Sequence, residues 1–344
     1  MGNKIIKDFI IKHKLSYALG IFFMLLTSYI QTLFPKVLGN TIDILKITNF
    51  NVRLVKINIA YILLIAVGTF LSTYVWRNLV IGNARKLECY LREVLYSHLQ
   101  KLSPEFYNRR KTGDLIAYAI NDISAVRMTF GPASAMSING IVICIFSIYS
   151  MSQAAGWKLT LMSLLPIPVI VYFMLKIGKL VQKNFRRVQE NFASISGRVQ
   201  ENIYGIRVIK AYVQEEDELK EFEKLNNQMM ESNLQMVRIS SFVSPMIELC
   251  FCISFVLNLI VGGNLVLKGN ISLGDFIAFN GYLTMIMIPV INIGRIITIF
   301  QRGMASQSRL NEIFNINPDI EDGNAMVTSD IKGKISSGSL KFMK

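Results

Sequence analysis

The stretch GRVQENIYGIRVIKAYVQEEDELKEFEKL, residues 197–225, lies between two apolar runs and decides how the rest of the sequence is interpreted. Its apolar side chains recur every three to four residues, which places them along one face of a helix, and charged residues occupy the other face. The apolar positions are Ile203, Ile206, Ile209 and Val213, followed by Leu219, Phe222 and Leu225. The pattern predicts that the chain leaves one long helix at Gly205, runs crosswise for a turn or two, and enters a second long helix.

The composition of the whole chain indicates a membrane protein. The 344 residues are 52% hydrophobic and the mean hydropathy is positive, which is too apolar for an ordinary soluble domain. The net charge of +14 could suggest nucleic acid, but the basic residues cluster beside the apolar runs, as cytoplasmic anchoring predicts. We therefore expect no nucleic-acid partner. The four cysteines and two histidines show no metal-ligand spacing, so no metal site is predicted.

Six apolar runs are each long enough to cross a bilayer, whose hydrocarbon core of about 30 Å needs about 20 helical residues. They cover residues 15–34, 57–79, 131–152, 158–177, 239–261 and 276–299. Lysines ahead of the first run place the N-terminus in the cytoplasm, and the even number of spans places the C-terminus there too. The expected fold is an all-α protein with six transmembrane helices, multi-pass in the cell membrane. Pro35 is expected to end the first span.

Two of the spans are predicted to continue as helices beyond the membrane. The helical period persists after Leu79, and a helix from Ile57 to Leu102 would be about 70 Å long at 1.5 Å per residue. The fourth run continues in the same way after Ile177. The sequence therefore predicts two long cytoplasmic helical extensions.

Three segments resemble the transmembrane domains of ABC exporters. Residues 201–222, ENIYGIRVIKAYVQEEDELKEF, resemble the family's second cytoplasmic loop, in which a glycine and an apolar, basic run form a short coupling helix. The first coupling loop of the family combines FF or FY, basic residues, TGDL and a later ND. That pattern appears here as Phe106, Tyr107, Thr112, Gly113, Asp114, Leu115, Asn121 and Asp122. After the last span, Ala305, Ser306, Arg309 and Ile313 match the family register A-S-x-x-R-x-x-x-I.

The resemblance implies a division of the chain. Residues 1–305 would form the exporter's type-1 transmembrane domain, and residues 306–344 a linker and the truncated start of a nucleotide-binding domain. Gly333, Lys334 and Ile335 match the Gly-x-Ile strand that opens this domain in the family. No G-x-x-x-x-G-K-[ST] pattern occurs in the chain, so no Walker A loop is available to cradle ATP phosphates. We expect no ATP hydrolysis and no cofactor in this chain alone, and ATP with Mg²⁺ in the complete transporter.

The resemblance also supplies candidate coupling residues and partners. The positions that match the two loops are Gly113, Asp114, Asp122, Gly205, Arg207 and Lys210. Closure of two nucleotide-binding domains would push the two short crosswise helices, and stiff helices would carry that displacement to the membrane. The implied partners are the lipid bilayer, nucleotide-binding domains, and a second half-transporter, either identical or related.

Two ionisable residues in or near the apolar runs are candidates for a substrate cavity. Glu248 and Arg295 would each cost a few kcal/mol in lipid unless they face a partner or water. One hypothesis places Glu248 in the cavity, where it would favour cationic, amphiphilic substrates. The alternative pairs Glu248 structurally with Arg295 or places it at the level of the inner headgroups.

Two other classes of function stay open at the level of the sequence. A secondary transporter would use broken helices with polar sites at the membrane midplane, and it would not need two deep cytosolic hairpins. A membrane sensor or scaffold could keep the hairpins while coupling them to a partner that is not an ATPase.

Overall fold

The computed structural model describes residues 2–46 and 52–318, and the regular structure in these ranges is helical, without a strand. The bounds of the α-helices are α1 (Gly2–Lys12), α2 (Lys14–Leu45), α3 (Val52–Leu99), α4 (Pro104–Arg109), α5 (Thr112–Ala117), α6 (Ile123–Met128), α7 (Ser134–Leu164), α8 (Pro166–Tyr204), α9 (Ile206–Ala211), α10 (Glu215–Ser241), α11 (Val243–Leu267) and α12 (Leu273–Phe314). Two π-helical turns, η1 (Tyr118–Asp122) and η2 (Thr129–Ala133), flank α6.

Membrane-capable helices account for most of the described chain. Five continuous helical stretches are long and apolar enough to cross a bilayer, and one of them, Thr112–Tyr204, is 93 residues long. This stretch reverses at Gly156, whose φ of 81° and ψ of 161° are not helical. The third and fourth predicted spans lie on either side of that turn. The all-α membrane architecture expected from the sequence is therefore confirmed.

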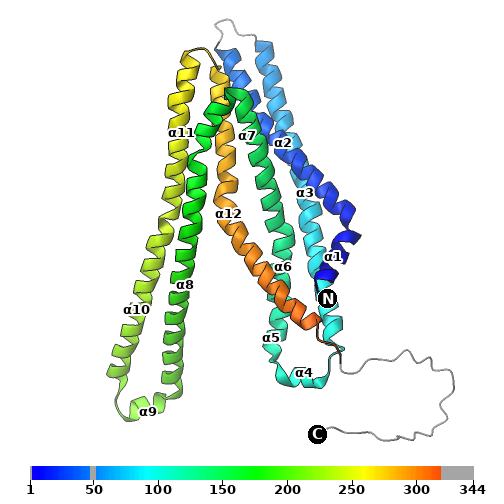
Figure 1. Cartoon of the computed structure of the whole chain (residues 1–344). Coiled ribbons are helices and arrows are strands. Elements are labelled where there is room, and N and C mark those ends of the chain that lie inside the picture. The colour runs from blue at the N-terminus through cyan, green and yellow to red at the C-terminus, as the bar shows by residue number, and fades with distance from the viewer. Residues whose placement is uncertain (1, 47–51, 319–344) are drawn as a thin grey trace, which may run out of the picture.

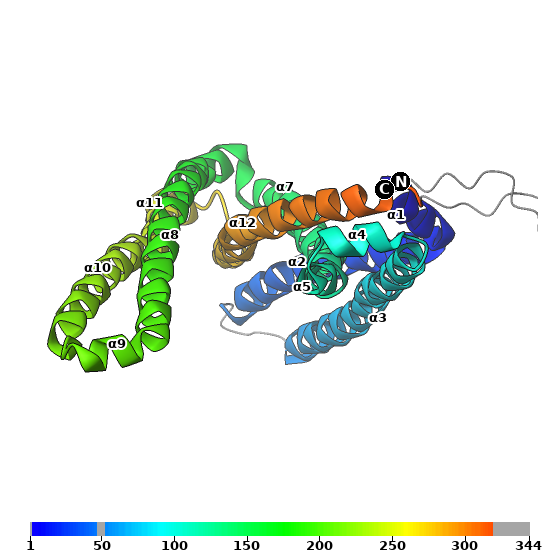
Figure 2. The same ribbon diagram turned by 90° about the horizontal axis from the view of Figure 1, so that it is seen from below.

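The helices form a body and an arm (Figure 1). The body comprises α2, α3, α7 and α12, and the arm comprises α8, α10 and α11. Figure 2 shows the lower part of the arm diverging from the body. At the opposite end a buried apolar cluster joins the two parts, with Met151 and Leu159 from α7, Ile170 from α8, Phe251 from α11 and Phe279 from α12.

Both extensions predicted beyond the apolar spans are helical. Helix α3 has 48 residues, so it is about 72 Å long at 1.5 Å per residue. Helix α8 runs 39 residues to Tyr204 and pairs with α10. Asn191 donates to the hydroxyl of Ser232 across this pair at 2.7 Å. Arg198 and Glu218 form an ion pair of 2.8 Å nearer the tip. These contacts join the two helices into one rod.

Pro35 does not end the helix that contains the first predicted span. Helix α2 continues through Pro35 to Leu45. A proline inside a helix removes one hydrogen bond, and tight packing against a neighbouring helix can compensate for that loss in a membrane protein. Pro35 is buried against Gly281 of α12, where an added Cβ would lie 2.9 Å from the proline Cβ. The glycine makes room for the proline ring.

The C-terminal boundary of the predicted transmembrane domain falls inside a helix, because α12 continues past residue 305 to Phe314. The Gly333, Lys334 and Ile335 match to a nucleotide-binding domain lies outside the described residues.

Candidate coupling tips and transmembrane pocket

Helix α9 forms the crosswise tip of the arm, as the repeating pattern in residues 197–225 predicts. It runs from Ile206 to Ala211 and joins the antiparallel α8 and α10 at the lower end of Figure 1. Gly205 caps α8 with a φ of −88°. The fold therefore places a short helix at the end of a long, paired rod.

The tip of the arm exposes an apolar surface. Six large apolar side chains are 47% to 80% exposed there: Ile203, Tyr204, Ile206, Val208, Tyr212 and Val213. The candidate coupling residues Arg207 and Lys210 are exposed among them, and Lys210 lies 3.5 Å from a carboxylate oxygen of Glu215. A contiguous exposed apolar surface with basic residues is typical of a docking site.

Val213 gives the tip its shape. Its φ is 55°, which is unusual for a β-branched residue. The amide of Gln214 donates to the carbonyl of Ile209 at 3.0 Å, which is the closing bond of a Schellman motif at the end of α9. Val213 occupies the position that glycine usually takes in this motif, so the turn into α10 holds a strained residue.

A second tip lies at the lower end of the body, where α4 and α5 meet. Gly113 and Asp114 are exposed in the first turn of α5, and nothing lies within 4 Å of a Cβ added at Gly113. Asp114 is well placed at the helix N-terminus, because a carboxylate there interacts favourably with the helix dipole. Ile116 and Ile120 expose apolar side chains beside them.

Asp122 differs from the other candidate coupling residues because it is buried. Arg309 of α12 forms an ion pair with it through two nitrogens, and the Nε to Oδ2 distance is 3.1 Å. Arg309 also donates to the hydroxyl of Ser306 at 3.0 Å. The structure thus joins the first coupling-loop motif to the A-S-x-x-R-x-x-x-I register at the end of α12. Hydrogen bonding to Asp122 raises the pKa of the Arg309 guanidinium.

A second charged cluster holds α3 to α6. Glu88 is 8% exposed and lies about 3 Å from the guanidinium groups of Arg85, Arg92 and Arg127. No sequence motif points to this cluster. Glu88 and Arg85 are three residues apart on one helix, which is a weak signal, and the approach of Arg127 depends on the tertiary fold.

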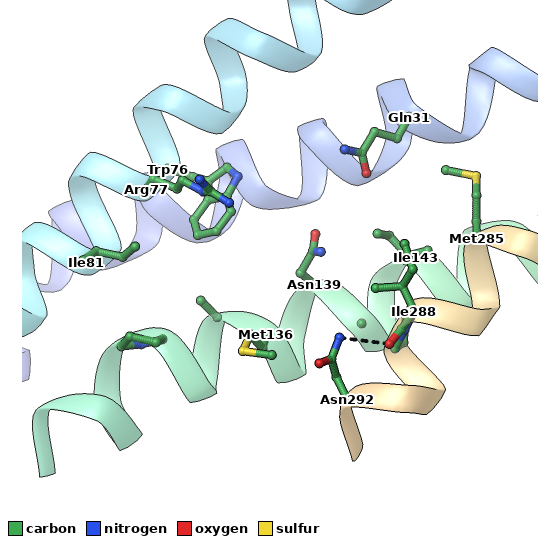
Figure 3. A pocket seen from close by; sticks show the side chains of 14 residues that line it. Gln31, Trp76, Arg77, Ile81, Met136, Asn139, Ile143, Met285, Ile288 and Asn292 are labelled. Atoms are coloured by element: carbon green, nitrogen blue, oxygen red, sulfur yellow. Dashed lines mark hydrogen bonds between the residues drawn. The ribbon is translucent and has the colours of Figure 1, made fainter. Parts of the chain in front are cut away.

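A pocket of about 480 Å³ opens between α2, α3, α7 and α12 (Figure 3). Its polar residues are Gln31 of α2, Trp76 and Arg77 of α3, Asn139 of α7 and Asn292 of α12. Methionines, isoleucines and prolines make up most of the remaining wall. This volume lies in the range of small-molecule sites, which are usually apolar with a few polar groups.

Neither residue predicted for the substrate cavity lines this pocket. Glu248 is exposed on α11, and Arg295 is exposed on α12, three residues after the pocket residue Asn292. Among the described residues no ion pair joins the two side chains. Arg77 lies near the end of the second apolar run, residues 57–79, and nothing in the sequence pattern shows that its helix face borders a pocket.

Comparison with known proteins identifies the family. The family model for the ABC transporter transmembrane region matches residues 17–290. The chain belongs to this family. Membership in the ABC transporter family does not favour the secondary-transporter and scaffold alternatives. It also agrees with the two coupling-loop resemblances and with the long helices that carry them.

Several exporters are similar to this ABC transporter chain over most of its length. A probable multidrug resistance ABC transporter ATP-binding/permease protein, YheI, from Bacillus subtilis is 31% identical over 308 residues, 90% of this chain and 53% of that protein. The multidrug resistance-like ATP-binding protein MdlA of Buchnera aphidicola (subsp. Schizaphis graminum) is 32% identical over 96% of this chain and 57% of its own length. An ATP-dependent lipid A-core flippase from Syntrophus aciditrophicus is 29% identical over 73% of this chain and 44% of its own.

This ABC transporter chain spans about half the length of the two more similar relatives. The family implies ATP and Mg²⁺ in a complete transporter, but the residues present do not fit a nucleotide site, because the Walker A pattern is absent from the sequence. The described residues also contain no group of three His, Cys, Asp or Glu side chains that could hold a metal ion. No step of nucleotide chemistry is assigned to this chain.

Proposed function

We propose that this chain is the membrane part of an ATP-driven exporter and receives the push of its ATPase units through two tips. The observation that carries the proposal is that both motifs of the coupling loops lie at the far ends of long helices. Helix α9 ends the arm, and the α4–α5 segment ends α3. Gly113, Asp114, Gly205, Arg207 and Lys210 would contact the ATPase units.

Asp122 would take a different part in the same proposal. Its side chain is buried against Arg309, so it would keep the α4–α5 tip attached to α12 instead of touching an ATPase unit. Displacement of the tip would then move α12 directly, and α12 lines the pocket with four residues.

The proposed assembly is a pair of half-transporters in the cell membrane, identical or related, with both termini in the cytoplasm. The α9 tip and the α4–α5 tip would face the cytoplasm, where ATP is available to the nucleotide-binding domains. The exposed apolar flanks of the arm helices, for example Leu249 and Phe255 of α11, are consistent with lipid or a second half-transporter as neighbours.

The test is ATP-driven efflux by this chain joined to the ATPase units of its transporter. Val208→Asp puts a charge on the exposed apolar surface of α9, and efflux is expected to fall at least tenfold. Met230→Asp makes the same change at an exposed position in the middle of α10 and serves as the matched control. Equal efflux in both variants would refute α9 as a coupling tip. Absence of ATP-driven efflux in the unmodified protein would refute the function itself.

A further inference from the structure

The pocket between α2, α3, α7 and α12 carries one kind of charge. Among the described residues, Arg77 is the only ionisable one that lines the pocket, and none of the lining residues is a carboxylate. The other polar lining groups are the amides of Gln31, Asn139 and Asn292 and the indole of Trp76. A cationic substrate would meet no opposite charge in this pocket, whereas an anionic group would meet one.

Arg77 has no carboxylate partner among the described residues. Its guanidinium carbon lies 5.7 Å from the centre of the Trp76 ring, and no ion pair includes it. The buried carboxylate farther along α3, Glu88, is already surrounded by Arg85, Arg92 and Arg127. A charged residue at the end of an apolar span needs water or an opposite charge, so Arg77 remains available to a ligand.

The polar residues of the pocket lie at different levels along the helices. Ile30 of α2 lies against Gly68 of α3, nine residues before Arg77, which corresponds to about 14 Å along a helix. The neighbouring Gln31 therefore lines the pocket far from the Arg77 end. Figure 3 shows Asn139 of α7 between the two.

The pocket residues of α12 can be placed along the same axis. Pro35 of α2 packs against Gly281 of the antiparallel α12, so Gln31 and Met285 lie at a similar level. Asn292 is seven residues farther along α12, toward its cytoplasmic end, and lies near the Arg77 end. Arg77 and Asn292 therefore lie toward the cytoplasmic end of the pocket, which Ile81 also lines four residues beyond Arg77, and Met285 and Ile288 line the α12 wall between the levels of Gln31 and Asn292.

We propose that this pocket binds an amphiphile with an anionic head, which Arg77 contacts, and an apolar body along α7 and α12. The inference rests on the proposed function, because it names the substrate class of that exporter. The head can belong to an acidic phospholipid of the inner leaflet or to a soluble anionic amphiphile, since both offer the same chemistry to a guanidinium.

The test is photolabelling of the full chain in phosphatidylcholine nanodiscs, without ATP. Two probes share a diazirine-bearing dodecyl tail, one with a phosphate head and one with a trimethylammonium head. We expect the phosphate probe to label peptides of α7 and α12 at least fivefold more than the ammonium probe. Adding phosphatidylglycerol to the nanodisc, or decyl sulfate to the buffer, shows which source of the head competes.

Two variants and a matched control test whether Arg77 supplies the positive charge that binds the phosphate head. Arg77→Gln is expected to lower phosphate-probe labelling about tenfold, and Arg77→Lys to retain most of it. Lys86→Gln removes one positive charge from an exposed position on the same helix outside the pocket and is expected to change nothing. Should Arg77→Gln fail to fold, the head-group preference of the unmodified chain and of Arg77→Lys decides.

Equal labelling by both probes, preference for the ammonium head, or full phosphate-probe labelling in Arg77→Gln would overturn the proposal. The assay needs no ATPase unit. Intact labelling with no ATP-driven efflux would therefore refute the proposed function and leave the anionic site standing as a binding site.

Discussion

Val213 is held in a left-handed conformation that its branched side chain disfavours. The turn into α10 needs a positive φ for the Gln214 amide to reach the carbonyl of Ile209. A strained residue in an exposed, apolar tip motivates the hypothesis that the Val213 side chain has a docking role, since glycine or asparagine would close the same turn at lower cost.

Val213→Asn is expected to stabilise this turn by about 1 kcal/mol, because asparagine tolerates the left-handed region better than valine does. Hydrogen exchange of the Gln214 amide, measured by NMR or mass spectrometry, should slow about fivefold. Val208→Asn, at an exposed position with ordinary helical geometry, is the control and should not slow it. Faster exchange in Val213→Asn would contradict the strain.

Glu248 tests the sequence-based hypothesis of a cationic substrate. Because Glu248 is exposed on α11 and does not line the pocket, Glu248→Gln is expected to leave labelling by the ammonium probe within twofold of the unmodified chain. A loss of fivefold or more, measured in the same nanodiscs, would restore Glu248 as a substrate-binding residue.

At the residue scale, the sequence could name Asp122 and Arg309 but not their contact. The two residues are 187 positions apart, and motif spacing carries no information on such pairing. Whether Asp122 is buried and whether Arg77 is free to contact a ligand also depend on which helix faces pack together. An apolar run in a membrane protein has no clear periodicity that would show this packing.

The ion pair between Asp122 and Arg309 links two elements, η1 and α12. Asp122→Asn is expected to destabilise their contact by about 1 kcal/mol, because the carboxylate is buried while Arg309 is half exposed and partly screened. A thermal-shift assay should show a lower unfolding temperature, and Asn121→Ala, at an exposed neighbouring position, should not. An unchanged unfolding temperature in Asp122→Asn would show that this ion pair does not stabilise the contact between η1 and α12.

The direction of the pKa shift of Arg309 determines how the stability contributed by this ion pair depends on pH. A raised pKa of Arg309 means that the folded state holds its proton more tightly than the unfolded state does. The contribution is therefore complete below the unfolded pKa of arginine and is lost only as pH rises through the higher folded pKa. Titration of Arg309 should consequently leave stability unchanged throughout the neutral and mildly alkaline range.

A close approach between α2 and α12 is the second element-scale contact. The amide of Gly274 donates to Asp43 at 2.7 Å, and a Cβ at Gly274 would lie against the carbonyl oxygen of Gly39 and 2.5 Å from Asp43. Both neighbours belong to α2, so the two helices touch through their backbones near the start of α12.

Gly274→Ala is expected to destabilise the protein by about 1–3 kcal/mol, because the added methyl group overlaps backbone that cannot move independently. Gly263→Ala is the control in α11, where nothing lies within 4 Å of an added Cβ, and it should be neutral or slightly stabilising. Both can be compared by thermal shift. Equal unfolding temperatures would show that the α2–α12 contact adapts easily.

The proposed coupling requires that the paired rod formed by α8 and α10 be stiff. Ser194→Pro removes a backbone hydrogen bond at an exposed position in the part of α8 that pairs with α10 and costs about 3 kcal/mol locally. ATP-driven efflux in the complete transporter is expected to fall at least tenfold, whereas photolabelling of the pocket should persist. Ser194→Ala is the control. Undiminished efflux with proline would mean that the rod need not be rigid.

At the scale of the molecule, the sequence predicted the helical class, the long extensions and the crosswise α9. Apolar length and helical period are local properties, so they can be read from the chain. The continuation of α2 through Pro35 could not be predicted, because it depends on Gly281 nearly 250 residues away. The divergence of arm and body could not be predicted either, since no local pattern encodes it.

The attachment of α12 beside the α4–α5 tip has a mechanical consequence. Arg309 binds Asp122, and His98 of α3 lies 2.9 Å from the carbonyl of Ile313, so the polypeptide leaves α12 from an anchored point. Force applied to the residues that follow Phe314 would act first on the ion pair between Arg309 and Asp122 and on the contact between His98 and Ile313. Beside the two proposed tips, the backbone that continues from α12 would therefore be a further path by which force reaches the pocket, and it would need no docking surface.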